Sequence, residues 1–185
     1  MTSHWLFQLA AVLVGLFWLV GAYNRLMRLR NAVMRAWEQF DPALQRRSEA
    51  MARVVEAMRG PLADEAGTLQ ALLDADARQR QSAAAVGQAR AQVEAVSNWV
   101  AAEAALASPA SRLRALIELH RPVNPDGLPD PALAQALATW AEIEPRLGFA
   151  RQAFNDAAQI YNRALQQWPT RIITGPFGFH LAGRA

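Results

Sequence analysis

An uncharged apolar run opens the chain and continues into a patterned helix without any turn signal. The run is WLFQLAAVLVGLFWLVGA, Trp5–Ala22, in which Gln8 is the single polar side chain. Eighteen helical residues at ~1.5 Å each reach ~27 Å, which is about the thickness of a bilayer's hydrocarbon core. Trp18 and Tyr23 lie near its end, where aromatic rings favour the headgroup zone. The pattern predicts a transmembrane anchor over residues 1–22.

Beyond this run, apolar residues recur seven positions apart, the spacing of long helices that pack lengthwise against one another. The clearest row is Trp140, Leu147, Phe154, Tyr161 and Trp168. The pattern predicts helices over residues 23–59, 62–86, 88–121 and 130–168, followed by an apolar tail over 170–185. Short connections between them predict an all-α fold, an antiparallel four-helix bundle of long helices whose first helix is continuous with the transmembrane helix.

Turn signals set the expected boundaries. Gly60-Pro61 ends the first helix, and Asp130-Pro131 reads as the cap and first residue of the last one. The Pro-rich stretch 122–131 is a loop that no helix crosses. The segment between the first helix and this loop would make a rod of ~90 Å, against ~55 Å for the first helix, so it must fold back. The expected position is Arg80–Ser82 or Gly87.

Three prolines fall inside predicted helices: Pro42, Pro109 and Pro145. An interior proline removes one backbone hydrogen bond and costs ~3 kcal/mol unless the helix bends or restarts there. One hypothesis is that the three share a bent layer, because they lie at comparable distances from the far end of their helices. The alternative is that Asp41-Pro42 restarts a helix and that the other two are unrelated.

Charges around the apolar run set the expected orientation. No Lys or Arg precedes it, whereas four arginines follow it before the first acid, Glu38: Arg25, Arg28, Arg30 and Arg35. By the positive-inside rule, the amino terminus lies outside and the bundle lies in the cytoplasm, at the bacterial inner membrane. The alternative is a signal peptide cleaved after Ala22, which would give an exported soluble bundle.

Composition argues against several classes of chemistry. The chain has 19 basic residues, all of them arginine, a net charge of +3 and no Cys, so neither disulfides nor thiolate metal sites can form. A modest net charge is no nucleic-acid signature in itself. The three histidines lack ligand spacing, and no catalytic triad or phosphate loop is present. We therefore expect no enzyme activity, no cofactor and no nucleic-acid partner.

Charged residues at matching heights predict ion pairs between the first and last helices. Counted from the membrane end, Arg47 and Glu144 lie at the same height in antiparallel helices, and so do Glu38 and Arg151. We expect both pairs to form. Their expected role is to fix the helix register, which is the best-attested use of buried polar pairs.

A second polar group is expected beside the membrane. Antiparallel packing brings together Tyr23, Asn24, Arg28 and Asn31 from the first helix, and Asn155, Tyr161 and Asn162 from the last. This layer either binds a ligand at the bilayer surface or orients the bundle on its anchor through hydrogen bonds. The candidate lipid contacts are Arg25, Arg28, Arg30, Phe177 and Phe179.

Two stretches are specific enough to indicate a family. The first is Tyr23–Asn31, followed by Ala36-Trp37, Asp41 and Arg46-Arg47. The second is Glu144–Arg151, followed by Phe154-Asn155, Tyr161-Asn162, Trp168-Pro169 and Phe177–Phe179. Both resemble the corresponding ends of the LemA family, with Pro145 where the family usually has Asn; the resemblance is weak between about Ala66 and Ala102. It implies a membrane-anchored four-helix bundle and no established reaction.

These patterns predict a non-enzymatic, membrane-anchored helical bundle that binds or organises other membrane components. The bilayer is one expected partner, a protein is the other, and the pattern leaves self-association open. A second hypothesis is a lipid-binding, membrane-shaping protein that acts through its juxtamembrane arginines and apolar tail.

Overall fold

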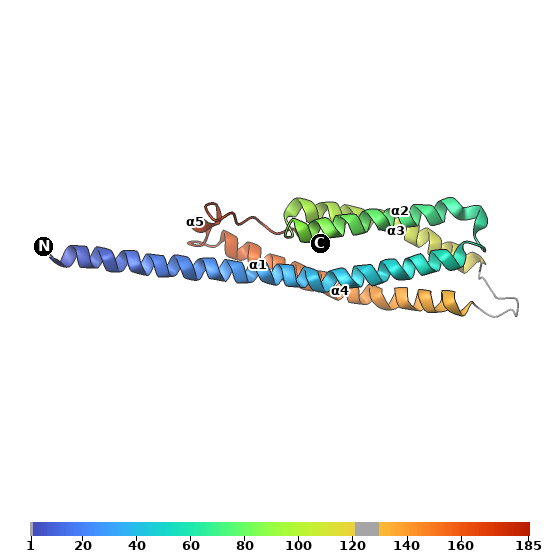
Figure 1. Ribbon diagram of the computed structural model, residues 1–185, viewed down its shortest axis with the longest axis horizontal. Coiled ribbons are helices and arrows are strands. Elements are labelled where there is room, and N and C mark those ends of the chain that lie inside the picture. The colour runs from blue at the N-terminus through green and yellow to red at the C-terminus, as the bar shows by residue number, and fades with distance from the viewer. Residues whose placement is uncertain (1, 121–129) are drawn as a thin grey trace.

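The computed structural model describes residues 2–120 and 130–185, and the regular elements of these residues are helices (Figure 1). They are α1 (Thr2–Met58), the 3-10 helix η1 (Ala63–Glu65), α2 (Ala66–Gln88), α3 (Val93–His120), α4 (Pro131–Gln166) and α5 (Arg171–Thr174). An isolated β-bridge joins Gln92 to Ala182. The predicted all-α class is confirmed for this part of the chain. Most of the predicted loop 122–131 lies outside the described residues.

Helix α1 runs without interruption from the apolar run to the far end of the molecule. Its 57 residues correspond to ~86 Å of helix. Between Phe7 and Val20 its side chains are exposed, except that Leu19 is half-buried. This part is long and apolar enough to cross a bilayer, a criterion that signal sequences near an amino terminus also meet. From Leu26 onward one face of α1 is buried against the rest of the chain, which we call the helical body (residues 23–120 and 130–185).

The helical body is built from two antiparallel helix pairs. Helix α1 packs along α4, and α2 packs along α3. The register of α1 against α4 is visible where the ring of Trp37 meets that of Phe154, with centroids 5.4 Å apart. Near the apolar run, Arg25 Nη2 donates to Gln167 Oε1 at 3.5 Å. This register places Arg47 level with Glu144 and Pro145.

The turn between α2 and α3 lies at residues 89–92, so the predicted fold-back at Arg80–Ser82 or Gly87 is wrong. The polar run at 80–82 lies within α2, largely toward solvent, and Gly87 is helical beside Trp37. The actual turn has no Gly or Pro; instead Arg90 and Ala91 adopt positive φ values of 51° and 58°. Such backbone is uncommon for these residues, and it carries no sequence signal. It is held by local and tertiary contacts: Ala91 N–H donates to the Val86 carbonyl at 2.8 Å, and the Ala91 carbonyl accepts a hydrogen bond from Gly183 N–H at 2.9 Å.

The α2–α3 hairpin is too short to reach the end of the body that adjoins the apolar run. Helices α2 and α3 have 23 and 28 residues, against 36 in α4, so the hairpin ends ~12–20 Å short. Figure 1 shows its turn near the middle of α1, with the C-terminus beside it. Helix α5 and the tail after it cover α1 and α4 where the hairpin is absent. The tail is therefore part of the core, since Phe179 and Ala182 are buried in it.

Local sequence signals explain most helix ends, but the interior prolines do not end the helices that contain them. The Asp130 side chain accepts from Ala132 N–H at 2.8 Å, and Pro131 is the first residue of α4, as predicted. Helix α2 begins four residues later than expected because η1 intervenes. Helices α1, α3 and α4 continue through Pro42, Pro109 and Pro145.

Candidate functional site

A layer of polar residues divides the core of the helical body in two. On α1, one hydrophobic cluster extends from Leu26 to Leu44, and the other extends from Ala50 to Met58. Arg47 and Ser48 lie between the two clusters and are 5% and 8% exposed. Both therefore lie on the buried face of α1, which is apolar before and after them. We call the residues that meet at this level the polar layer; it also includes Asp76, Gln79 and Glu103.

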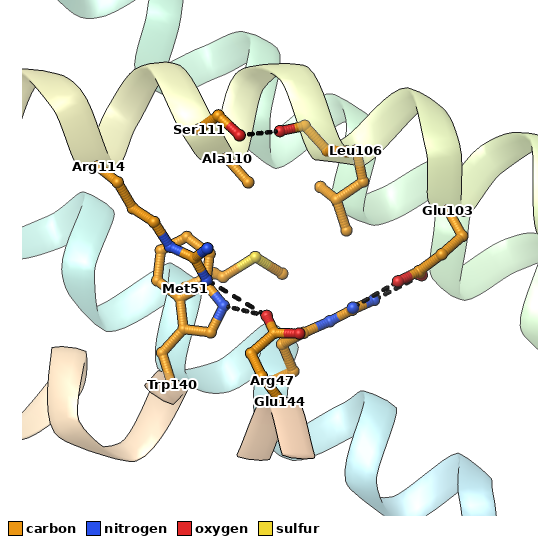
Figure 2. Close-up of a pocket in the computed structure, with 10 residues that line it drawn as sticks. Arg47, Met51, Glu103, Leu106, Ala110, Ser111, Arg114, Trp140 and Glu144 are labelled. Carbon is orange, nitrogen blue, oxygen red and sulfur yellow. Dashed lines mark hydrogen bonds and ion pairs between the residues drawn. The ribbon is translucent and has the colours of Figure 1, made fainter. Parts of the chain in front are cut away.

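Arg47 forms the central contact of the polar layer. Its Nη1 and Nη2 donate to Glu103 Oε1 and Oε2 on α3 at 2.5 and 2.6 Å, a bidentate pair (Figure 2). Burial on its own would lower the pKa of the Arg47 guanidinium, but the hydrogen bonds and charge of Glu103, together with the charges of Glu144 and Asp76, outweigh it and the pKa is raised. Arg47 is therefore charged inside the core and depends on Glu103 for its neutralisation.

A second contact of the polar layer joins α1 to α2. Ser48 Oγ donates to Asp76 Oδ2 at 2.5 Å, and Arg80 Nε donates to the same oxygen at 3.0 Å. Asp76 is 5% exposed, whereas the side chain of Arg80 is 54% exposed. The carboxylate is thus buried with one partner in the core and one at the surface.

The polar layer is incompletely satisfied. Within the described residues, four buried side-chain atoms in or beside it have no hydrogen-bond partner: Arg47 Nε, Asp76 Oδ1, Gln79 Nε2 and Trp99 Nε1. An unpaired buried polar atom costs about 1–3 kcal/mol, so an apolar layer would be more stable. Seams of apolar residues seven apart can slide past one another, whereas a bidentate ion pair forms in one register only. We infer that the layer specifies the alignment of α1, α2 and α3.

A cavity of about 170 Å³ adjoins the polar layer between α1, α3 and α4 (Figure 2). Arg47 and Glu103 line one part of it. On the other part, Glu144 Oε1 accepts from Trp140 Nε1 at 2.8 Å and from Arg114 Nη2 at 3.3 Å. The Arg114 guanidinium lies over the Trp140 ring, 4.1 Å from its centroid. The charged groups around the cavity are thus paired with one another.

The two predicted cross-helix ion pairs are wrong. Arg47 and Glu144 do lie at the same height and line the same cavity, but Arg47 pairs with Glu103 and Glu144 pairs with Arg114. Arg151 lies 3.7 Å from Glu103 and over the Trp99 ring, while Glu38 is exposed and forms no ion pair with another described residue. Counting residues along helices gives only the height of a side chain above the membrane end. It does not give the side of the helix from which the side chain projects, and Arg47 projects toward α3.

The predicted polar layer beside the apolar run does not form between α1 and α4. On α1, Asn24, Arg28 and Asn31 are exposed, and Tyr23 packs its ring against Phe177 and Phe179 at 5.4 and 5.7 Å. Tyr161 is buried, and this burial raises its pKa, although the charge of Arg30 acts in the opposite direction. Of the candidate lipid contacts, Phe179 is 6% exposed and unavailable, and Arg25 reaches Gln167.

Asn155 and Asn162 instead hold the C-terminal tail against α4. The Asn162 amide donates to the Ala182 carbonyl and accepts from Ala182 N–H, both at 2.8 Å. The Asn155 amide makes the same two bonds to Ala185, at 2.6 and 2.7 Å. On the other side of the tail, Gly183 lies so close to α3 that an added Cβ would be 2.4 Å from Val96 Cβ. We call these contacts the tail clamp; they join the α1–α4 pair to the α2–α3 hairpin.

The tail clamp predicts a local loss of protection. We expect Asn162→Ala to expose the Ala182 amide, because it removes the side chain that binds both the N–H and the carbonyl of Ala182. Leaving such buried groups unpaired costs about 1–3 kcal/mol. Amide hydrogen exchange of the full chain should show faster exchange at Ala182 and Gly183. Asn31→Ala, at an exposed asparagine of α1, is the control and should change nothing there. Unchanged protection in the Asn162 variant would refute the clamp.

Three of the polar-layer residues could have been identified from the sequence. Glu103 continues the row Val96, Trp99, Leu106 and Ala110 at alternating spacings of three and four. Asp76 and Gln79 continue the row Leu69, Leu72, Ala83 and Val86 in the same way. The signal is a polar residue within the apolar row of each helix. It becomes visible only when the apolar rows of all the helices are compared. The tail clamp has no comparable signal, because its bonds are to backbone groups.

The comparison with protein families adds one finding to this geometry. A search of curated proteins found no match. The model of the LemA family matches residues 36–183, a range that contains Arg47, Glu103, both clamp asparagines and most of the tail. Because this match covers well over half of the chain, the protein belongs to the LemA family.

Proposed function

We propose that this protein is a non-enzymatic interaction scaffold, an antiparallel four-helix bundle held at the inner face of the bacterial inner membrane. The exposed apolar run of α1 supports the anchor, since the helical body does not cover it. Four arginines after that run and none before it support an external amino terminus and a cytoplasmic bundle. Membership of the LemA family is consistent with a helical protein of this kind.

An exposed apolar stripe on α4 carries the proposal of a protein partner. Phe149 and Ile160 are 75% and 53% exposed, and Ala153 between them is exposed as well. At ~100° per residue, the three lie within about 40° of one another around the helix; the exposed Asp156 lies on the same face, so the stripe carries one acid between Ala153 and Ile160. The register of α4 against α1 places Phe149 ~30 Å from Ala22, well beyond the bilayer. Large apolar side chains grouped in the aqueous part of a protein indicate a binding surface.

The paired charges around the polar layer support a structural role for the core. Arg47 pairs with Glu103, Arg114 with Glu144, and Asp76 with Ser48 and Arg80. Each ionised group thereby has a partner within the protein. We propose that these pairs keep the bundle in one register, so that the stripe of α4 is presented in a fixed position relative to the membrane.

Photocrosslinking in membranes tests the scaffold. With a photoreactive residue at Phe149 of the full chain, we expect a discrete adduct with a cytoplasmic or inner-membrane protein, because this residue projects from the stripe. Ala77, exposed on α2, is the control position and should give no such adduct. Absence of any protein adduct at both Phe149 and Ile160 would refute the interaction role. An adduct with a periplasmic protein would refute the orientation.

A further inference from the structure

The segment after α4 has three large apolar side chains on the outside. Trp168, Ile172 and Phe177 are 81%, 62% and 47% exposed. In the same segment Thr170 is buried, together with Ile173 and Phe179. Three large apolar residues facing outward within ten positions are unusual at a water-exposed surface. We call Trp168, Ile172 and Phe177 the apolar tip.

The apolar tip lies where the apolar run of α1 ends. Tyr23, the first residue after Ala22, packs against Phe177 with ring centroids 5.4 Å apart. Arg25 reaches Gln167, which precedes Trp168. Leu19, within the apolar run, packs against the same core cluster that contains Phe179. If Trp5–Ala22 spans the bilayer, the tip is therefore at the level of the headgroups, the zone that Trp side chains favour.

The same end of the molecule is basic. No acidic residue precedes Glu38 on α1, and none follows Asp156 in the chain. The exposed arginines nearest the apolar run come from both ends of the sequence: Arg25, Arg28, Arg163 and Arg171. Basic residues close to a bilayer are attracted to anionic headgroups by about 1 kcal/mol each. Charge and apolar exposure thus point to the same partner.

We propose that the apolar tip inserts into the interfacial layer of an anionic bilayer, in the leaflet from which α1 emerges. This inference rests on the proposed anchor and extends it, because the helical body is then attached to the membrane at two points. A single span leaves a rod free to tilt. A second contact beside it fixes the angle at which α1 and α4 leave the surface. The residues differ from those that the sequence indicated, since Phe179 is buried and Trp168 and Ile172 take its place.

The absence of Cys permits a clean spin-label test in the full chain. We would place a nitroxide at Ile172→Cys. The control position is Leu119→Cys, which is 77% exposed near the C-terminal end of α3, far from the apolar tip. The protein is reconstituted in vesicles of phosphatidylcholine with phosphatidylglycerol. We expect the label at 172 to collide severalfold more with oxygen than with a water-soluble nickel chelate, relative to the label at 119.

The outcomes separate the tip from the anchor. If the protein resists alkaline extraction from the vesicles but both labels are equally accessible to the nickel chelate, the anchor stands and the inserted tip is refuted. If the protein is extracted, the anchor itself fails and the tip with it. A label at 172 that is shielded from both oxygen and nickel indicates burial against protein, and this outcome also overturns the proposal. Trp168→Gln in the labelled Ile172→Cys chain should shift the label toward water.

Discussion

Replacing Glu103 by Leu is expected to lower the free energy of unfolding by about 3–5 kcal/mol, the cost of leaving a buried charge without its partner. Arg47 is 5% exposed, and its Nη1 and Nη2 both donate to this carboxylate. Arg151, the other cation near Glu103, has a side chain that is 43% exposed and can turn to water. The loss therefore falls on Arg47. Urea unfolding of the full chain in detergent micelles, followed by circular dichroism, measures it.

A matched control separates burial from charge. Glu142→Leu removes an acid that pairs with Arg146 at the surface, where both side chains are more than half exposed. We expect a change of no more than about 0.5 kcal/mol, because exposed pairs four residues apart contribute little. Equal effects of the two substitutions would mean that Arg47 finds water or another acid, and would refute the dependence of Arg47 on Glu103.

The double variant Arg47→Met with Glu103→Leu tests what the pair is for. Replacing a buried ion pair by apolar residues of similar volume is often neutral or stabilising by about 1–4 kcal/mol. We expect stability to recover fully in this variant, while the uniqueness of the register is lost. Cysteine pairs introduced across α1 and α3 would report this loss as crosslinks in more than one register. A double variant that unfolds as readily as Glu103→Leu would contradict a specificity role.

The sequence predicted the helices better than their relations to one another. Apolar spacing identified all four long helices, because each must bury one continuous face and the face repeats every seven residues. It could not place the α2–α3 turn, since Arg90 and Ala91 adopt left-handed backbone without a Gly, and the tail supports the turn through Gly183, bonded to Ala91, and Ala182, paired with Gln92. These contacts join residues about ninety apart in the chain. The part of the turn's stabilisation that comes from so far away leaves no local signature.

For the candidate site too, single residues were predicted better than the contacts between them. Arg47 was expected to form an ion pair between helices, and it does form one. Its partner was predicted wrongly, because height along an antiparallel helix does not reveal which of three neighbours a side chain faces. Asn155 and Asn162 were predicted as two members of a polar layer with residues of the first helix, and that layer does not form. They bind the tail, however, which was expected to lie near lipid and which fills the space left by a short hairpin.

Replacing Phe154 by Ala is expected to destabilise the body by about 3–5 kcal/mol, whereas Phe149→Ala, five residues away on α4, should change stability by no more than about 0.5 kcal/mol. Phe154 is 0% exposed, and its ring meets Trp37 at 5.4 Å in an edge-on arrangement. Trp37 also contacts Phe40 and Trp99, so the cluster joins α1, α3 and α4. Removing Phe154 leaves a cavity at this junction.

The same two variants should divide stability from binding. Phe149 is 75% exposed and belongs to the proposed partner stripe, so Phe149→Ala should keep the unfolding curve and reduce crosslinking from Ile160. Near-ultraviolet circular dichroism should change in Phe154→Ala, because the environment of Trp37 changes, and remain constant in Phe149→Ala. Equal loss of stability in both variants would place Phe149 in the core. Unreduced crosslinking in Phe149→Ala would remove it from the partner surface, and the scaffold proposal would then depend on Ile160 alone.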